Sequence, residues 1–371
     1  MEQQFSKTQG EEGLKFTFDL MGMITGALIR PVETVLASER VDGVVFDTYQ
    51  PYMELSAIAL NLPYIHVANA VPFDVSGVTP LCFFDWGFAD SVEARRRNLE
   101  GVEAFRRLLE PSLQVAKQYT YERKIVVDWD DLTATRSKLG WITQLPMEFD
   151  FGSIASNDAL THTGPFVNEG LRPSIAFPWA ELKDAPLVYA SMGTLQNGIE
   201  SAFRSILDAA KRLEHLQFVV AVGDKLDKAS FQPLPGNVLM VAVAPQLELL
   251  KRASLCITHA GLNTVLEALT YGVPLVALPV TNDQPGVAAR IRDKGIGEFI
   301  SPSELSADRL SFVIQRVLGE PGYHAQAQRM ASAISVADGI SSAAHQIESA
   351  CTNAASRQTE SGQHAESSHP A

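Results

Sequence analysis

The sequence predicts an α/β protein of two domains, each built around a parallel sheet with helices packed on it. The chain has 371 residues, which exceeds the size that one ordinary hydrophobic core supports. Its second half alternates short, apolar, β-branched runs with helical stretches, a pattern typical of a doubly wound parallel sheet. From residue 149 to 185, Gly, Pro, Asn and Ser become frequent and periodicity fades, so we expect the interdomain connection there.

The first domain is predicted over residues 1–148. Leu20, Ile24 and Leu28 recur at near-helical spacing and predict a helix over residues 15–40. The apolar run that follows predicts a strand over 41–46, which ends just before Asp47. The other elements expected in this half are a helix over 51–60, a strand over 63–67, a long charged helix over 91–117 and a final element over 138–144.

The second domain is predicted over residues 186–350. Its expected strands cover residues 187–191, 217–222, 238–243, 254–258 and 275–278, with helices in the intervals between them. Hydrophobic residues become rare near the C-terminus, and we expect a disordered tail over residues 351–371.

One strand-turn-helix segment carries the strongest functional signal. The buried-strand pattern of residues 254–258 is followed by Gly261, which opens a helix predicted to end near residue 271. The free N–H groups and positive dipole end of such a helix favour a phosphate. His259, the Asn263 amide and the Thr264 hydroxyl add donors at the same end. This segment therefore predicts a phosphate site.

Further polar residues extend this site beyond the phosphate. Glu267 lies four residues after Asn263 on the same helical face, where a carboxylate suits a ribose diol. Asp283 and Gln284 follow the next strand, where they could hydrogen-bond sugar hydroxyls. Each residue alone has an ordinary structural explanation, such as a helix cap or a solvated helix face. The ordered set instead points to a nucleotide sugar.

This ordered set, with residues 186–198 before it and 283–291 after it, resembles the donor-binding signature of the family 1 UDP-glycosyltransferases, and most of all their bacterial branch. The resemblance implies a GT-B fold, two Rossmann-like doubly wound parallel-sheet domains. It implies that Glu267 holds the ribose, that Asp283 and Gln284 hold the transferred sugar, and that Gln246 lies near the nucleoside. The residues implied at the diphosphate are Gly193, Thr194, His259, Gly261, Asn263 and Thr264. In plant members, a tryptophan that stacks on uracil occupies the position of Val243. We still expect UDP rather than dTDP as the nucleotide, but without the support of that stacking contact.

The catalytic base is the missing part of the pattern. Inverting transfer needs a base that deprotonates the acceptor hydroxyl, and the family supplies a histidine after its first N-terminal strand, oriented by a carboxylate. Asp47 matches the position of that carboxylate, although a turn or cap aspartate is the ordinary alternative. The first histidine of the chain is His66, which lies on the strand after Asp47 and so on the wrong element. We therefore expect an incomplete N-terminal domain, short by about 80–100 residues against a typical two-domain length.

Composition limits the partners that we expect. A net charge of −13 argues against nucleic acid, which needs a basic footprint. The three cysteines, Cys82, Cys256 and Cys351, lack metal-ligand spacing. Neither a signal peptide nor an uninterrupted apolar run of membrane-spanning length is apparent. We expect a cytoplasmic protein that uses no metal, with a UDP-sugar as co-substrate and at most peripheral membrane contact.

Three functions remain open. The first is an inverting glycosyltransferase that moves a hexose, glucose by preference, from a UDP-sugar to a hydroxyl of a lipophilic small molecule. The second is a catalytically impaired nucleotide-sugar-binding remnant or regulatory protein that lacks the histidine. The third is a GT-B epimerase acting on a UDP-sugar, which would release a product without any acceptor.

Overall fold

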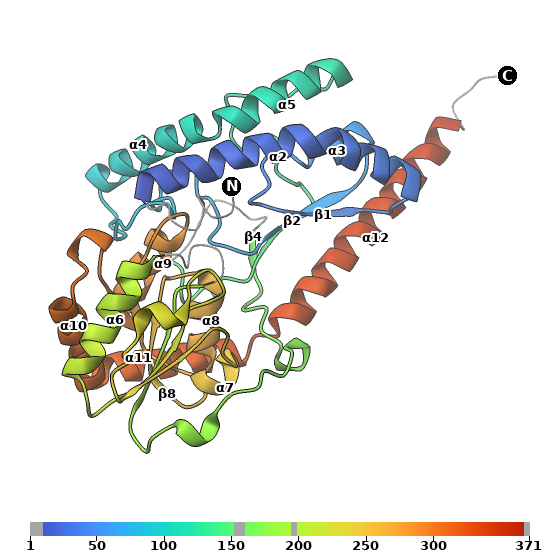
Figure 1. Cartoon of the computed structure of the whole chain (residues 1–371). Coiled ribbons are helices and arrows are strands. Elements are labelled where there is room, and N and C mark those ends of the chain that lie inside the picture. Colours follow the sequence, from blue (N-terminus) through green and yellow to red (C-terminus); the bar gives the residue numbers. More distant parts are fainter. Residues whose placement is uncertain (1–9, 152–159, 194–198, 367–371) are drawn as a thin grey trace.

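The computed structural model describes residues 10–151, 160–193 and 199–366, with only the backbone described beyond residue 352. Two α/β domains lie one above the other in Figure 1, and a long C-terminal helix runs from the second to the first. The two-domain architecture predicted from the sequence is therefore confirmed.

The first domain contains a sheet of four parallel strands in the order β1-β2-β3-β4. The strands are β1 (Val44–Asp47), β2 (Tyr64–Ala68), β3 (Trp141–Thr143) and β4 (Leu160–His162). Four helices pack above this sheet in Figure 1: α2 (Gly10–Glu39), α3 (Leu55–Ala59), α4 (Val92–Leu108) and α5 (Glu110–Arg123). The long helix expected over 91–117 is thus two helices, and Pro111 stands in the first turn of the second.

Helix α2, with 30 residues, is the longest helix of this layer. It contains an 18-residue window with a mean hydropathy of 1.4, of which 17% is buried, so by length and composition it passes the test for a membrane span. The sequence analysis expected no such segment. A mostly buried core helix of a soluble protein and an N-terminal signal sequence pass the same test, so the finding is weak evidence for a membrane span. Helix α2 packs along α5 and α3 above the first sheet.

The second domain contains six parallel strands in the order β10-β9-β8-β5-β6-β7. The order reverses between the neighbours β5 and β8, which makes this point the topological switch of a doubly wound sheet. The strands are β5 (Leu187–Ser191), β6 (Gln217–Ala221), β7 (Val238–Val241), β8 (Ala253–Thr258), β9 (Leu275–Ala277) and β10 (Gly297–Phe299). The helices are α6 (Glu200–Arg212), α7 (Gln246–Leu250), α8 (Leu262–Thr270), α9 (Gln284–Asp293), α10 (Ala307–Gly319) and α11 (Pro321–Ser335).

Strand β5 shows why the strands of this sheet are apolar throughout. Leu187 and Tyr189 belong to the hydrophobic core on one face, whereas Val188 and Ala190 belong to the core on the other. A strand covered on both faces has no polar side, so its sequence lacks alternation. This is the pattern from which the strands were predicted.

The boundaries of the interdomain connection differ from those expected. Strand β4 pairs with β3 of the first sheet, so residues up to 162 belong to the first domain rather than to a linker that begins at residue 149. The chain then passes to β5 through short 3-10 turns at Glu169–Leu171 and Trp179–Glu181.

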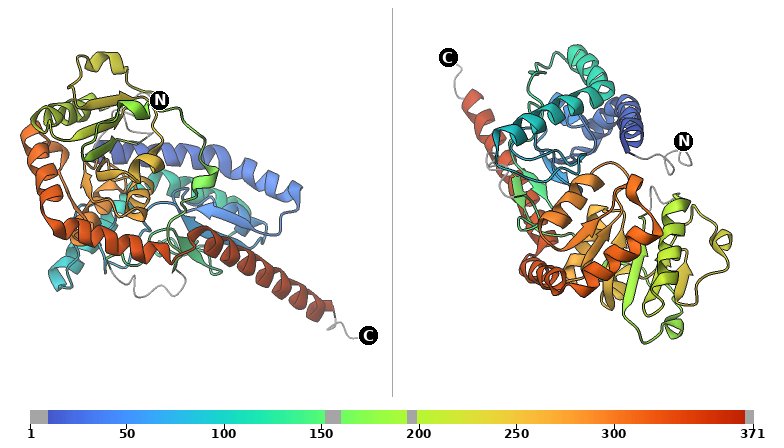
Figure 2. Two further views of the ribbon diagram at one scale, coloured as in Figure 1. Left: turned by 90° about the horizontal axis from the view of Figure 1, so that it is seen from below. Right: turned by 90° about the vertical axis from the view of Figure 1, so that its left-hand side faces the viewer.

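Helix α12 (Gly339–Glu366) corrects two expectations about the C-terminus. It leaves the second domain and packs on the face of the first sheet opposite α2, where Ala343 and Ile347 meet Ile65 and Ile142 (Figures 1 and 2). The second domain therefore ends before residue 350. Residues 351–366, expected to be disordered, are the last turns of this helix, because Ala, Gln and Glu favour a helix even where apolar residues are few.

The two domains meet through buried polar contacts as well as shared apolar packing. Arg290 of α9 donates to Asp150, which lies after β3 in the first domain, through Nε (2.9 Å) and Nη2 (2.7 Å), and both side chains are at most 4% exposed. The N–H of Gly286 donates to the carbonyl of Cys82 at 2.8 Å. The start of α9 is therefore fixed against the first domain.

Candidate functional site

A cavity of about 410 Å³ opens at the switch point of the second sheet. Gly193 follows β5 and His259 follows β8, and both line it, so the cavity lies beyond the carboxyl ends of the two strands where the order reverses. Ligands of open α/β sheets bind at this place. Five of the predicted donor residues line the cavity: Gly193, Gln246, His259, Asn263 and Thr264.

Helix α8 presents its N-terminus to this cavity. Gly261 is its N-cap residue, in an extended conformation, and Asn263 and Thr264 lie in the first turn. The first N–H groups of a helix have no partner within the helix. An anion in the cavity would therefore meet free backbone donors and the positive end of the helix dipole.

The two site glycines make room for the ring of His259. Gly193 has a φ of +76°, and a Cβ at either Gly193 or Gly261 would overlap the imidazole. The sequence analysis explained Gly261 by the approach of an anion to the backbone. The structure adds a second reason, since the ring of His259 lies between the two glycines.

His259 is held as a neutral imidazole. Burial lowers its pKa to about 4, because the low-dielectric surroundings disfavour the charged form. Its Nδ1 atom is buried and has no hydrogen-bond partner among the described residues. A buried ring nitrogen without a partner calls for one from outside the chain, and a diphosphate in this cavity would supply it.

A chain of hydrogen bonds joins Gln246, Glu267 and Thr264 of the predicted donor set. The hydroxyl of Tyr189 donates to Oε1 of Gln246 at 2.8 Å, and Nε2 of Gln246 donates to Glu267 and, at 3.4 Å, to Thr264. Glu267 is 2% exposed, yet it also accepts from Arg172. This carboxylate is thus buried and charge-paired before any ligand arrives.

Arg172 is a site residue that the sequence analysis missed. It lies in the connection before β5, lines the cavity and pairs with Glu267 across 95 positions of sequence. The neighbouring sequence gives no signal for Arg172, because the connection has no periodicity and the contact with Glu267 forms only in the folded chain. Gln144 was missed as a site residue for the same reason: it directly follows the first-domain strand β3, and its Nε2 donates to Oδ1 of Asn263 at 2.7 Å.

The residues predicted at the transferred sugar lie at the domain interface. Burial raises the pKa of Asp283 to about 6, although its Oδ2 accepts a hydrogen bond from the N–H of Val71 in the first domain at 3.4 Å. The side-chain oxygen of Gln284 accepts from the N–H groups of Val280 (2.8 Å) and Thr281 (3.1 Å), and these bonds stabilise the loop before α9. Thr194, also predicted at the diphosphate, lies outside the described residues.

Val243 lines the cavity where a base would sit. Its side chain is 59% exposed, and it stands between Ala242 and Ala244, which also line the wall. The wall therefore offers aliphatic packing rather than an aromatic face. Base recognition without a stacking tryptophan, which the sequence analysis expected, stays a prediction.

Asp47 and His66 lie apart from this cavity. Asp47 ends β1, is exposed, and accepts a hydrogen bond from the N–H of Tyr49 at 2.8 Å, which is the turn role that the sequence analysis weighed. His66 is 6% exposed and accepts at Nδ1 from the N–H of Ser137. Both residues line a second cavity in the first domain. No hydrogen bond joins Asp47 to a histidine in the part of the chain that the structure describes.

Comparison with known proteins identifies the family. The profile of the erythromycin biosynthesis protein CIII-like C-terminal domain matches residues 204–348. The chain is 30% identical over 330 residues to zeaxanthin glucosyltransferase of Pantoea ananas, a match that covers 88% of this chain and 76% of that protein. The solved glycosyltransferase of kitacinnamycin superposes with a TM-score of 0.70 at 19% identity, over 91% of this chain and 82% of the other. Os79 from O. sativa in complex with UDP superposes with a TM-score of 0.63 at 19% identity, over 87% and 81%. The chain therefore belongs to the family 1 glycosyltransferases, the UDP-glycosyltransferase family, and is an enzyme of that family with the GT-B fold.

Proposed function

We propose that this enzyme transfers a hexose, glucose in the first instance, from a UDP-sugar to a hydroxyl group of a lipophilic small molecule with inversion at the anomeric carbon. The observation that carries the proposal is the switch-point cavity: the first turn of α8 and His259 both line it, and the buried Nδ1 of His259 has no hydrogen-bond partner among the described residues. A nucleoside diphosphate matches this arrangement because its charge meets fixed donors.

Each part of the donor has a place in this cavity. The diphosphate would lie at the first turn of α8, with His259 and Thr264 as side-chain donors. The ribose would reach Glu267, and the base would pack against the wall at Val243. The fixed donors would stabilise the negative charge that grows on the departing diphosphate, so we propose that the reaction needs no metal ion.

A lipophilic acceptor is supported by a third cavity and by the relative that acts on zeaxanthin, as its name states. This cavity, of about 730 Å³, lies between the start of α2, the junction of α4 and α5, and the loop that carries Thr281 and Asn282. Its apolar lining includes Leu14, Phe84 and Leu108. Asp283 follows directly in the same loop, so an acceptor here would lie beside the proposed position of the transferred sugar.

The test is calorimetric titration of the purified chain with UDP, UDP-glucose and dTDP, followed by mass spectrometry of reactions that contain zeaxanthin as the acceptor. We expect UDP to bind more tightly than dTDP, and a β-glucoside to form with or without a chelator. His259→Ala should weaken UDP binding by roughly tenfold or more, since it removes a hydrogen bond to a charged group.

His215→Ala is the matched control, because His215 lies in the turn before β6 and is exposed. A folded His259→Ala variant with unchanged UDP affinity would refute the donor assignment. Tight UDP binding without transfer would instead favour the impaired, nucleotide-sugar-binding alternative, a candidate kept because no histidine is hydrogen-bonded to Asp47 among the described residues.

A further inference from the structure

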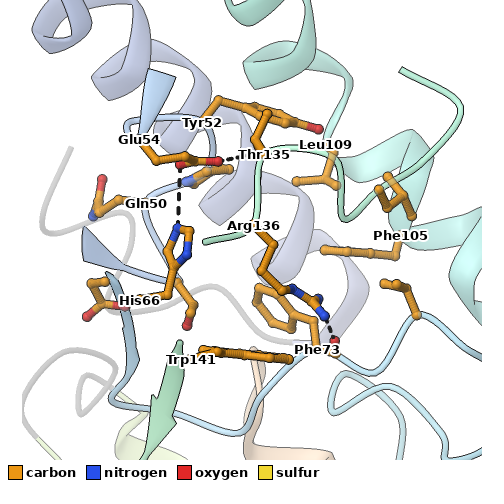
Figure 3. Close-up of a pocket in the computed structure, with 15 residues that line it drawn as sticks. Gln50, Tyr52, Glu54, His66, Phe73, Phe105, Leu109, Thr135, Arg136 and Trp141 are labelled. Carbon is orange, nitrogen blue, oxygen red and sulfur yellow. Dashed lines mark hydrogen bonds and ion pairs between the residues drawn. The ribbon is translucent and has the colours of Figure 1, made fainter. Parts of the chain in front are cut away.

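The first domain contains a cavity that the proposed donor site does not use. It lies between the sheet and the helices above it, has a volume of about 90 Å³, and is shown in Figure 3. Phe73, Phe105 and Leu109 form an apolar wall, and the indole of Trp141 forms the floor. Arg136 also lines this space, and we call it the Arg136 cavity.

Arg136 brings a positive charge into this cavity without a carboxylate beside it. Its guanidinium lies over the indole of Trp141 at 4.0 Å from the ring centroid. The one hydrogen bond shown for it in Figure 3 runs from Nη2 to the carbonyl of Phe73 and is long, at 3.5 Å. None of the ion pairs formed by the described residues includes Arg136. A largely buried cation without a paired anion is costly.

The nearest acidic residues do not supply this anion. Burial lowers the pKa of Arg136, and the charges of Asp74 and Asp131 offset only part of this effect. Asp74 accepts from Thr79 at 2.7 Å, and Asp131 accepts from Thr133 at 2.7 Å, so each carboxylate is bound within its own loop. The guanidinium therefore has N–H donors that face the cavity, and these donors lack a strong acceptor.

The other side of the cavity carries an acceptor. Glu54 and His66 lie there in Figure 3, with Oε2 of Glu54 at 3.9 Å from Nε2 of His66. The hydroxyl of Thr135 donates to the second oxygen of Glu54 at 2.5 Å. Because Nδ1 of His66 accepts from a backbone N–H, its Nε2 carries the proton in the neutral ring and faces Glu54.

Two buried polar atoms of the lining have no partner among the described residues. They are Nε1 of Trp141, whose side chain is 2% exposed, and the hydroxyl oxygen of Thr48. Buried donors without partners are rare in folded proteins and require an explanation. A bound molecule that offers oxygen acceptors would satisfy the indole N–H and the guanidinium together.

We propose that the Arg136 cavity binds a small aromatic carboxylate that carries a ring hydroxyl. The carboxylate pairs with Arg136, a single ring packs against Phe73 and Phe105, and the hydroxyl donates to Glu54. The enclosed volume of about 90 Å³ is below that of a cavity of about 150 Å³ that holds a benzene molecule, so a single ring lies partly at the open side of the cavity. This site is separate from the donor cavity, so the proposal does not depend on the proposed function.

The test uses 4-hydroxybenzoate and its neutral, isosteric amide, 4-hydroxybenzamide, in calorimetric titrations of the full chain. We expect the acid to bind at least tenfold more tightly than the amide, because an ion pair with a desolvated guanidinium is lost in the amide. Arg136→Met should remove this preference, whereas Arg136→Lys should keep part of it. Arg96→Met on the exposed face of α4 is the matched control and should change nothing.

A second readout locates the ligand. The indole N–H resonance of Trp141, identified by its loss in Trp141→Phe, should shift with the acid in the wild-type protein. Equal affinity for the acid and the amide, or no binding of the acid at about 5 mM, overturns the proposal without the use of any variant. A chain that fails to bind UDP would refute the proposed function and leave this test unaffected.

Discussion

Glu267 offers the sharpest test of how the donor cavity recognises its ligand. This carboxylate is 2% exposed and accepts from Gln246 and Arg172 before a ligand binds. A ribose hydroxyl that donates to it forms a hydrogen bond to a charged group, worth about 1.5–3 kcal/mol. Because Arg172 already neutralises part of the charge of Glu267, we count the energy of one such hydrogen bond to the ribose rather than two. Glu267→Ala should therefore weaken UDP binding by about 10- to 100-fold.

The assay is a thermodynamic cycle in which the Glu267 side chain is removed from the protein and the ribose hydroxyls are removed from the ligand. Calorimetry gives the affinity of the wild-type chain and of Glu267→Ala for UDP and for 2′,3′-dideoxyuridine diphosphate. We expect the wild-type protein to bind the dideoxy ligand more weakly than UDP by most of the same 10- to 100-fold. The variant should bind the two ligands with almost equal affinity. Glu214→Ala, at an exposed position of the same domain, is the control. Equal losses for both ligands in the variant would mean that Glu267 supports the fold rather than the ribose.

Two further predictions concern the domain interface. Arg290→Met should lower the free energy of unfolding by about 3–5 kcal/mol, because it leaves Asp150 buried without its partner; denaturation with urea should show the loss, and Asp150→Asn added to Arg290→Met should recover part of it. Asp283→Asn should stabilise the fold at pH 8. The raised folded pKa of Asp283 means that ionisation costs stability as the pH rises from 3.8 to about 6, by at most about 3 kcal/mol. The melting temperatures of wild type and variant should therefore differ at pH 8 and converge near pH 4, and a difference independent of pH would contradict this cause.

The strands that could be predicted from the sequence are those buried on both faces. Strand β5 was placed at its observed bounds, and β8 within one residue, because each is a short apolar run between turn signals. Strands β4 and β10 were missed because, unlike the equally short but fully buried β9, they are only partly buried and do not form an apolar run. Helix α12 was mistaken for a tail over its second half because apolar residues are few there, whereas its contacts with the first sheet come from its first half, through Ala343, Ile347 and Ala350.

The candidate site divides in the same way. His259, Asn263 and Thr264 were predictable because a strand, a turn and a helix N-terminus place them together within a few residues of sequence. Arg172 and Gln144 were not, because each reaches the site across about a hundred positions and no local rule selects it. Sequence reasoning thus finds the groups that the local backbone presents and misses those that the fold brings to them.

These long-range contacts tie the donor site to the first domain. Gln144, which is 2% exposed, holds Asn263 at the start of α8, and the N–H of Val71 holds Asp283. Both acceptors are residues whose positions were predicted from the donor half alone. The geometry around the proposed positions of the diphosphate and the sugar therefore depends on loops that follow β2 and β3 of the first sheet. We therefore expect changes in those loops to alter donor affinity without touching the nucleotide, since the two domains share the hydrogen bonds that fix the ends of the proposed donor site.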